Sequence, residues 1–519
     1  MTRLSEKVLE GKDFIVTCEF VPGRGPTGRR VDEAVEFGKK VASSDLPVHA
    51  ISITDNPGGN PAISPDVLAK ELQAMGVEAL VHFACTDANR NMIESRAYAL
   101  ARDGVENLLV VTGDCPTSGY GGMPKSIFDL DSVQVIRYLK EMNEGLAIPG
   151  RKKGTFDTLP KTGFFVAAVV SPFKKLEAEL MTQFFKLEKK IRAGADLIIP
   201  QLGYDVRKFA EVVKYMKYRG LSSPILGNVY VVSRPVARLM NKGHIPGCVV
   251  TDELLQRIEQ EADAPDKGKK ARLERAAQLT AIFKGMKFNG VHIGGFGLKF
   301  EDFEYIIRRS EETADNWREF IPNFRYHQED ECFLFPDDPE LTFADEKLVP
   351  VELPIRRRKS LSFRMSRCFH RRVFTEGALL YRLNKRVYRL LDRWKLAGRV
   401  GYFFERQIKR LLFDCQECGD CALFDVAYLC PMAKCAKFQR NGPCGGSRHG
   451  MCEADDTKKC VWTLAYGRFN ATDNLDYIRD EYIPPVDCAL SKTSSWANLY
   501  LARDHTGKKL KEAKSPQAD

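Results

Sequence analysis

Short apolar runs alternate with longer amphipathic stretches through the first three hundred residues of the chain. The runs predict eight strands, at residues 14–20, 49–54, 79–85, 107–112, 164–170, 197–201, 225–232 and 291–294. Between them, apolar residues recur at the spacing of one helix face, which predicts helices such as 31–42, 66–76, 91–103, 176–193 and 205–218. Glycine follows several of these stretches, as it follows many helix C-termini.

This alternation predicts an α/β fold. Eight strands with helical crossovers in about 300 residues fit a (β/α)8 TIM barrel. A doubly wound open sheet is the alternative, but no G-x-G-x-x-G motif follows the first strand, as it would in a dinucleotide-binding sheet. The chain has 519 residues, which is long enough for at least two domains.

Hydrogen-bonding or ionisable side chains stand at the ends of six successive predicted strands. They are Glu19, Thr54, His82, Thr86, Asp114, Ser171 and Gln201. A single acid just beyond a strand is more often a helix N-cap or a solvated loop residue. Six strand ends in a row predict a shared site, because a barrel carries its chemistry at the carboxyl ends of its strands. Zinc proteolysis, α/β-hydrolase acyl transfer and P-loop ATP hydrolysis have no motif in the sequence.

The second candidate site is a group of eight cysteines in the C-terminal part of the chain. They are Cys415, Cys418, Cys421, Cys430, Cys435, Cys444, Cys452 and Cys460. The first four form C-x2-C-x2-C-x8-C followed by proline, a spacing close to that of cubane iron–sulfur sites. Eight thiolates suffice for two [4Fe–4S] clusters, which predicts electron transfer. Two four-cysteine zinc sites are the main alternative, and disulfides are the least favoured one.

The net charge of +10 is concentrated in one segment. Residues 356–410 contain 18 Lys and Arg against three acids, so the rest of the chain is mildly acidic. This distribution argues against nucleic acid as a partner. Apolar residues between Leu379 and Trp394 recur at helical spacing, which predicts an amphipathic helix with a basic outer face. The helix is either a connector or a docking surface for an acidic partner such as ferredoxin, or for polyanions.

The sequence also bears on the compartment. The N-terminal stretch lacks the pattern of a signal peptide, and no run of eighteen apolar residues predicts a membrane span. We therefore expect a cytoplasmic protein whose thiols are reduced, which favours metal ligation by the clustered cysteines. A homo-oligomer is compatible with the sequence, which does not fix the oligomeric state.

Five runs of the first three hundred residues resemble methylenetetrahydrofolate reductase, in order and at family-like spacing. They are TCEFVPG, ISITDNPGGN, VHFACTDANR, LLVVTGDCP and KKIRAGADLIIPQLGYD. The runs CQECGDCALFDVAYLCPMAKCAK, NGPCGGS and CVWTLAYGR resemble the cysteine-rich partner protein of this reductase in acetogens and related anaerobes. The resemblance implies a fusion with a flavin-binding barrel at 1–310, a basic helical connector at 311–410 and a cysteine-rich domain at 411–519.

The resemblance also implies residue roles in the reduction of 5,10-methylenetetrahydrofolate to 5-methyltetrahydrofolate. Glu19 matches the general acid, for which we expect burial to raise the pKa. Asp114 matches the acid beside flavin and pterin, and Gln201 a pterin contact. The resemblance further implies that the flavin (FAD or FMN) is contacted by Thr54, His82, Thr86, Gly113, Asp114 and Ser171. It implies that the phosphates of the flavin are bound by Lys186, Lys189 and Lys190. Without the resemblance, the three lysines are equally well explained as a solvated helix face.

Departures from the family pattern leave some contacts open. Thr112 stands where bacterial reductases commonly have arginine, and Ser171 where many have tyrosine, so the choice between FAD and FMN is not fixed. The last strand ends in HIGGFG instead of an arginine-bearing end, so its folate contacts cannot be carried over.

Two hypotheses follow for the source of electrons. In the first, iron–sulfur clusters pass electrons from ferredoxin or an electron-transfer subunit to the flavin. In the second, the cysteines hold zinc in a docking module, and NAD(P)H reduces the flavin. The sequence does not decide between methionine synthesis and one-carbon energy metabolism, and it gives residues 473–519 no role.

Overall fold

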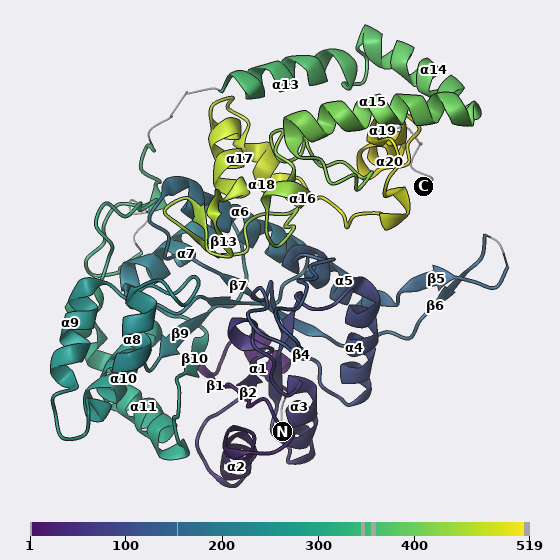
Figure 1. Cartoon of the computed structure of the whole chain (residues 1–519). Coiled ribbons are helices and arrows are strands. Elements are labelled where there is room, and N and C mark those ends of the chain that lie inside the picture. The colour runs from purple at the N-terminus through teal and green to yellow at the C-terminus, as the bar shows by residue number, and fades with distance from the viewer. Residues whose placement is uncertain (1–2, 153, 344–347, 354–359, 513–519) are drawn as a thin grey trace. The chain divides into compact units, whose positions relative to one another are not determined.

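The computed structural model describes residues 3–152, 154–343, 348–353 and 360–512 (Figure 1). By their contacts the residues fall into two compact units. The first unit comprises Met1–Leu353 together with the short segment Cys444–His449. The second unit comprises Pro354–Pro443 and Gly450–Asp519.

Eight parallel strands form a nearly closed barrel in the first unit, as the sequence predicts. They are β1 (Ile15–Phe20), β2 (Ala50–Ile53), β3 (Ala79–Ala84), β4 (Asn107–Val111), β7 (Phe165–Val170), β8 (Leu197–Pro200), β9 (Leu226–Tyr230) and β10 (Gly290–Gly294). Their order is β8-β7-β4-β3-β2-β1-β10-β9, so the first strand pairs with the last. A parallel bridge between Ile198 and Ile225 brings the two edge strands together.

Helices surround this barrel (Figure 1). They are α1 (Leu4–Glu10), α2 (Arg29–Ser43), α3 (Pro65–Ala74), α4 (Arg90–Arg102), α5 (Ser132–Glu144), α6 (Glu177–Arg192), α7 (Val206–Tyr218), α8 (Arg234–Asn241), α9 (Asp252–Glu261), α10 (Lys269–Gly285), α11 (Phe300–Glu312) and α12 (Trp317–Phe320). Gly76, Gly104 and Gly220 follow α3, α4 and α7 with positive φ, the conformation that stops a helix at glycine. A hairpin of β5 (Ala147–Pro149) and β6 (Phe156–Thr158) follows α5.

The inside of the barrel changes from apolar to polar along the strands. Its lower part is a closed cluster that includes Ile15, Ala50, Leu80 and Leu109, and Leu4 of α1 packs into the same cluster. Because side chains alternate across a strand, the positions two and four residues further on face the same interior. These upper positions carry the polar side chains, so the fold gathers them at one end of the barrel.

The second unit is mainly helical. Its helices are α13 (Leu361–Val373), α14 (Leu379–Arg393), α15 (Lys395–Phe413), α16 (Pro431–Lys434), α17 (Val461–Asn470), α18 (Leu475–Asp480), α19 (Ser495–Tyr500) and α20 (His505–Glu512). The predicted amphipathic helix is α14, but Leu379, Leu380, Leu383 and Leu390 are exposed instead of buried. Within the described residues, no helix is both long and apolar enough to cross a membrane.

Candidate functional site

The polar end of the barrel holds a compact group of one carboxyl and two imidazoles. Glu19 lies on β1, His82 on β3 and His292 on β10. The Glu19 Oε2 atom is 3.2 Å from His292 Nε2 and 3.7 Å from His82 Nε2. Thr17, two residues before Glu19 on the same strand face, hydrogen-bonds His292 Nδ1 at 2.8 Å. Ser52 of β2 hydrogen-bonds His82 Nε2 at 3.0 Å, so both rings are fixed in orientation.

The electrostatics of this group differ from the expectation for Glu19. Burial acts to raise the pKa of the Glu19 carboxyl, but the hydrogen bond from His292 and the charge of the imidazoles outweigh it and lower that pKa. Burial lowers the pKa of His82 to about 4. Glu19 is therefore a carboxylate and His82 a neutral imidazole near pH 7. The expected rise in the Glu19 pKa does not occur, because the imidazole partners together outweigh burial, which is the largest single influence.

Gly294 explains how the carboxylate fits against the last strand. A Cβ at this position would lie 3.1 Å from Glu19 Oε1, so a larger residue would press on the carboxylate. The glycine-bearing end of β10 thus leaves room for Glu19 beside His292.

The loops after β2, β3 and β4 carry four of the predicted cofactor residues. Thr54 is buried after β2. Thr86 donates a hydrogen bond to the main-chain oxygen of Asp114 at 3.1 Å. Gly113 has φ +80°, and a Cβ there would lie 2.7 Å from Thr86. The structure thus brings Thr86, Gly113 and Asp114 into direct contact.

Ser171 and Gln201 follow β7 and β8, where they lie near the segment Cys444–His449. A Cβ on Gly445 would lie 3.7 Å from Ser171, and a Cβ on Gly247 would lie 3.2 Å from Gln201 Nε2 and 3.6 Å from the Gly445 carbonyl. The Lys174 ammonium donates to the carbonyls of Gly445 and Ser447, the latter at 2.8 Å. The Ser171 hydroxyl is buried and has no hydrogen-bond partner in the described part of the chain.

The three predicted phosphate-binding lysines are not a solvated helix face. Lys186, Lys189 and Lys190 lie on α6 and are all buried. Lys190 donates to the Val169 carbonyl at 2.6 Å. Burial, followed by the charge of Lys186, lowers the pKa of Lys190 to about 7. Three buried lysines on one helix favour a site for an anion.

Sequence reasoning missed three members of the group around Glu19. His292, Thr17 and Ser52 lie within predicted strands instead of at their ends. The alternation rule could have found Thr17, because it is two residues from Glu19. His292 needed the pairing of β1 with β10, in which Thr17 lies opposite His292.

The second candidate site is a cavity in the second unit. Four predicted cysteines line it, namely Cys415, Cys418, Cys421 and Cys430. The Lys409 ammonium, from α15, lies 3.5 Å from Cys421 Sγ and 2.5 Å from Ser495 Oγ. Burial lowers the pKa of Lys409, but the Cys421 thiol and Glu405 outweigh it and raise that pKa overall. Within the described residues, none of the eight clustered cysteines forms a disulfide.

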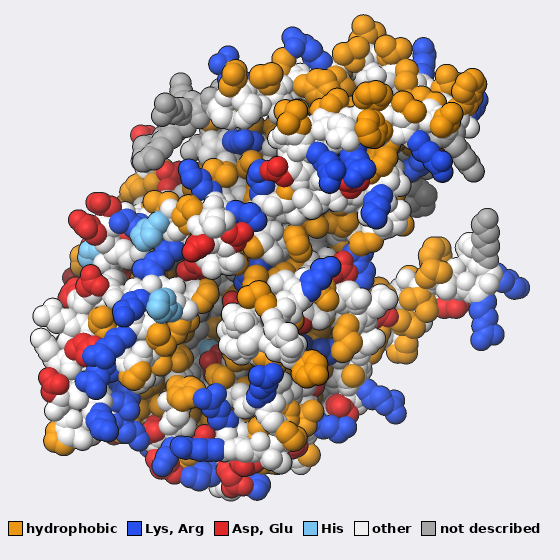
Figure 2. Space-filling view, viewed as in Figure 1, with side chains coloured by type: hydrophobic (Ala, Val, Ile, Leu, Met, Phe, Trp, Pro, Cys, Tyr) orange, Lys and Arg blue, Asp and Glu red, His pale blue; other side chains and the backbone are white. Residues whose placement is uncertain are grey.

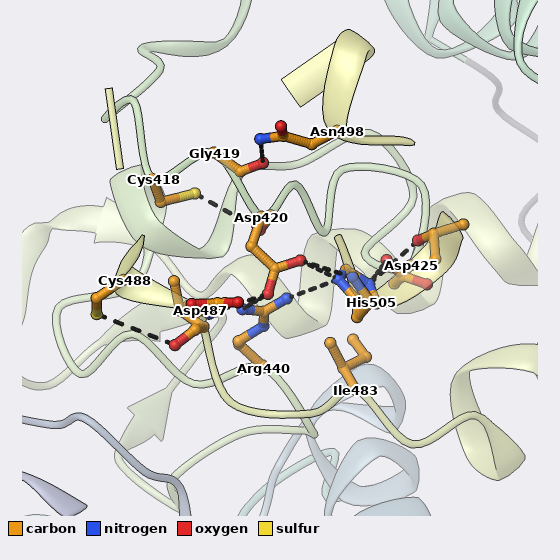
Figure 3. Close-up of polar contacts among 12 residues, drawn as sticks. Cys418, Gly419, Asp420, Asp425, Arg440, Ile483, Asp487, Cys488, Asn498 and His505 are labelled. Atoms are coloured by element: carbon orange, nitrogen blue, oxygen red, sulfur yellow. Dashed lines mark hydrogen bonds and ion pairs between the residues drawn. The ribbon is translucent and has the colours of Figure 1, made fainter. Parts of the chain in front are cut away.

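A buried ionic network holds the loop that carries these cysteines (Figure 3). His505 Nδ1 contacts the Asp420 carboxylate, and Asp420 lies between Cys418 and Cys421 in the sequence. The other ring nitrogen of His505, Nε2, is 3.2 Å from Asp425 Oδ2. Burial alone would lower the pKa of His505, but its bonds to the two carboxylates raise it to about 9. The Asn498 amide donates to the Gly419 carbonyl at 3.0 Å. Residues near the C-terminal end of the described chain therefore fix the cysteine loop.

The fold and the first site define a (β/α)8 barrel protein with an acid–base group at the carboxyl ends of its strands. The family model described as methylenetetrahydrofolate reductase matches residues 4–297, more than half of the chain, and the chain belongs to this family. A second family model, described as methylene-tetrahydrofolate reductase C terminal, matches residues 397–489.

Curated relatives carry the same family name. Methylenetetrahydrofolate reductase 2 of Saccharomyces cerevisiae is 26% identical over 227 residues, which are 42% of this chain and 34% of that protein. Methylenetetrahydrofolate reductase (NADH) 1 of Arabidopsis thaliana is 25% identical over 240 residues, 44% of this chain and 37% of that protein. The chain thus spans little more than a third of the length of these two relatives.

One solved structure with a similar chain path is a Clostridium thermocellum protein described as binding two copies of 5-methyl-5,6,7,8-tetrahydrofolic acid. It is 12% identical with a TM-score of 0.42, and the match covers 60% of this chain and 99% of that one.

Replacing His292 by leucine should raise the pKa of Glu19. The substitution removes the hydrogen bond that lowers this pKa and leaves burial, which raises it. Wild-type Glu19 should stay ionised as the pH falls through the ordinary range of glutamate, whereas the variant carboxyl should protonate above it. Infrared difference titration of the carboxyl bands measures the change, with the exposed His244→Leu as the matched control. An unchanged titration of Glu19 in His292→Leu would contradict the assignment.

Proposed function

We propose that the chain reduces 5,10-methylenetetrahydrofolate to 5-methyltetrahydrofolate at the polar end of the barrel. The observation that carries this proposal is the Glu19 carboxylate held between two imidazoles. Reduction of this substrate requires opening of a five-membered ring to an iminium, with a proton delivered to the leaving nitrogen. A carboxyl in hydrogen-bond contact with an imidazole can hold and pass such a proton. The family membership and the names of the relatives support the same activity.

The ionisation of Glu19 suggests two successive roles. As a carboxylate, Glu19 stabilises the positive charge of the iminium that must accept a hydride. As an acid, it needs a proton first, and His292 is the neighbour whose Nε2 lies in hydrogen-bond contact with it. Thr17 contacts the other nitrogen of His292, so the ring keeps the orientation that this transfer needs. Asp114 and Gln201 are proposed to contact the pterin.

We propose a flavin as the cofactor of this site, where it would supply the hydride when bound. Two features of the first unit fit such a ligand. The buried Ser171 hydroxyl has no partner in the described part of the chain, and a polar atom of a ligand would satisfy it. The buried ammonium groups of Lys186, Lys189 and Lys190 suit the phosphates of FAD or FMN. Thr54, His82, Thr86 and Gly113 are proposed to contact the same ligand.

We infer that the cysteine cavity of the second unit holds a [4Fe–4S] cluster, which would pass single electrons when bound. Cys415, Cys418, Cys421 and Cys430 line this one cavity. Their C-x2-C-x2-C-x8-C spacing is closer to that of cubane clusters than to the paired C-x2-C motifs of zinc sites, which supports the cluster.

The second cysteine set, Cys435, Cys444, Cys452 and Cys460, is proposed as another cluster from its number and spacing alone. The resemblance to the partner protein of anaerobes supports ferredoxin or an electron-transfer subunit as the donor. The reduced thiols that both sets require fit the cytoplasm.

A second candidate donor is NAD(P)H. The Arabidopsis relative, whose name specifies NADH, favours it. In this alternative the cysteine domain is a zinc-stabilised docking module. Metal analysis of protein purified without oxygen distinguishes the two hypotheses. Electron transfer through clusters requires iron, whereas the docking module of the NAD(P)H hypothesis requires zinc.

Glu19→Gln should abolish most folate reduction while the protein keeps its fold and its flavin. The amide has the shape of the carboxyl but cannot carry the proton, and such groups are worth about 100- to 10,000-fold in rate. Formation of 5-methyltetrahydrofolate from the methylene substrate, with chemically reduced flavin as the electron source, measures the effect. Turnover near that of the wild type would remove Glu19 from the mechanism.

Lys190→Met should weaken flavin retention. The loss of a buried, charge-assisted contact to phosphate corresponds to roughly tenfold to a hundredfold in Kd. Quenching of flavin fluorescence on titration into the apoprotein measures the affinity, and the flavin content of the purified protein gives an independent check. Lys217→Met, at an exposed lysine of α7, is the control. Equal affinity in the two variants would refute a phosphate site on α6.

Cys418→Ser should lower the iron content of the anaerobically purified protein and prevent its reduction by ferredoxin. The flavin of the intact barrel should still exchange electrons with the folate, because that reaction needs no cluster. Cys488→Ser, which replaces an exposed cysteine outside the group of eight, should keep the full iron content. Equal iron in the two variants, or zinc alone in the wild type, would contradict the cluster at this cavity.

A further inference from the structure

Helix α14 has three faces of different chemistry. The face that packs on α19 is aromatic, because Tyr381 and Tyr388 pack on Tyr500, and the exposed Asp392 at its edge pairs with Arg503 at 2.6 Å. A second face is basic and exposed, with Arg382, Arg386, Arg389 and Arg393. The third face is apolar and also exposed, with Leu379, Leu380, Leu383, Val387, Leu390 and, directly after the helix, Trp394. An amphipathic helix in a folded unit ordinarily buries its apolar stripe, and α14 does not.

Helix α15 repeats this arrangement. Its inner face carries Glu405 and Lys409, which are buried beside Ser495 and the cysteine cavity. Its outer face is apolar and exposed, with Leu396, Val400, Phe403, Phe404, Ile408, Leu411 and Leu412. A Cβ at Gly398 would lie 3.2 Å from the Leu391 carbonyl, so the chain turns tightly where α14 ends and α15 begins.

The exposed apolar residues of α14 and α15, with Trp394 between them, form what we call the apolar platform. Figure 2 shows hydrophobic side chains gathered over these helices, with Lys and Arg beside them. The exposure is large, at 84% for Leu379, 69% for Trp394 and 86% for Leu411. Contiguous apolar surfaces of this kind are rare on monomeric proteins and mark sites that bind a protein or a membrane.

The charge around the platform narrows the choice of partner. Two of the three acids between 356 and 410 are paired with cations, the exposed Asp392 with Arg503 and the buried Glu405 with Lys409, so the exposed rim is cationic. A second copy of the chain would bring two cationic rims together, which like-charge repulsion opposes. The partner therefore combines an apolar body with anionic groups.

The polarity of the platform favours lipid over a folded protein. Protein interfaces carry about one hydrogen bond per 100–200 Å². Among the described residues on the exposed apolar faces of α14 and α15, Gln407 is the polar side chain. The others are leucine, valine, isoleucine, phenylalanine and tryptophan side chains. Hydrocarbon needs no hydrogen bonds, whereas flanking Arg suits lipid phosphates and Trp suits the headgroup boundary.

We propose that the apolar platform binds an anionic membrane surface, with α14 and α15 lying in the headgroup region. The leucine and aromatic side chains enter the acyl boundary, and the arginines of the rim contact lipid phosphates. Neither helix crosses the bilayer, in agreement with the absence of a spanning helix among the described residues. This inference is independent of the reaction in the barrel.

The test is flotation of the full-length protein with lipid vesicles. We expect it to float with vesicles of phosphatidylcholine containing phosphatidylglycerol and to stay behind with phosphatidylcholine alone. Higher salt should weaken binding, because it screens the attraction between the rim and the lipid charges. Failure to bind the anionic vesicles, or equal binding to both kinds, would overturn the proposal and leave the acidic partner protein as the explanation of this surface.

Variants locate the binding on the platform. Leu383→Asp with Leu411→Asp should weaken vesicle binding by about tenfold or more, because both side chains are exposed and their loss affects only the lipid contact. Arg386→Gln with Arg389→Gln should weaken it roughly fivefold per charge. The matched control is Leu9→Asp, at a leucine of α1 that is 66% exposed. An equal loss in this control argues against the platform.

Sedimentation of the same variants tests self-association. The proposal expects the wild type and Leu383→Asp to have the same mass in solution. A wild-type dimer that Leu383→Asp dissociates would show that a second copy covers the platform, and would overturn the proposal.

Discussion

The candidate active site depends on the pairing of the first barrel strand with the last. In the β1–β10 register Thr17 lies opposite His292, although 275 residues separate them in the sequence. Because side chains alternate along a strand, this register also points Glu19 to the same interior, where it meets the His292 ring. If the register of β1 shifted by one residue, the Glu19 side chain would point outward to the surrounding helices instead of into the barrel. Barrel closure therefore creates the acid–base group.

The same closure sets the ionisation of that group. A carboxylate in an interior position is costly unless it has partners, and Glu19 has two imidazoles within 4 Å. Ser52 and Thr17 bind the imidazoles in turn, so His292 is held through both ring nitrogens and His82 through its Nε2. The apolar layer that begins at Ile15 and Leu80 closes the barrel below them.

The sequence predicted the strands well because a barrel strand has apolar residues on both faces and is bounded by turns. Glu19 was identifiable because it stands at a strand end and in a family-like run. His292 was missed, because its partner is set by pairing between distant strands and not by any local pattern. The burial of Lys190 and the low pKa of Glu19 were also beyond sequence reasoning, since both depend on neighbours that the fold brings together. Likewise, nothing local assigns Cys444–His449 to the barrel unit.

The cysteine cavity shows the same dependence in the second unit. The motif identified four candidate ligands, but not what keeps their loop in place. His505 and Asn498 hold that loop, and they lie in a region to which the sequence analysis assigns no role. His505 is an imidazolium at neutral pH because Asp420 and Asp425 bind it, and the removal of one member would leave a buried charge without its partner. The segment after Asp473 is thus part of the cysteine site, because it fixes the backbone between Cys418 and Cys421.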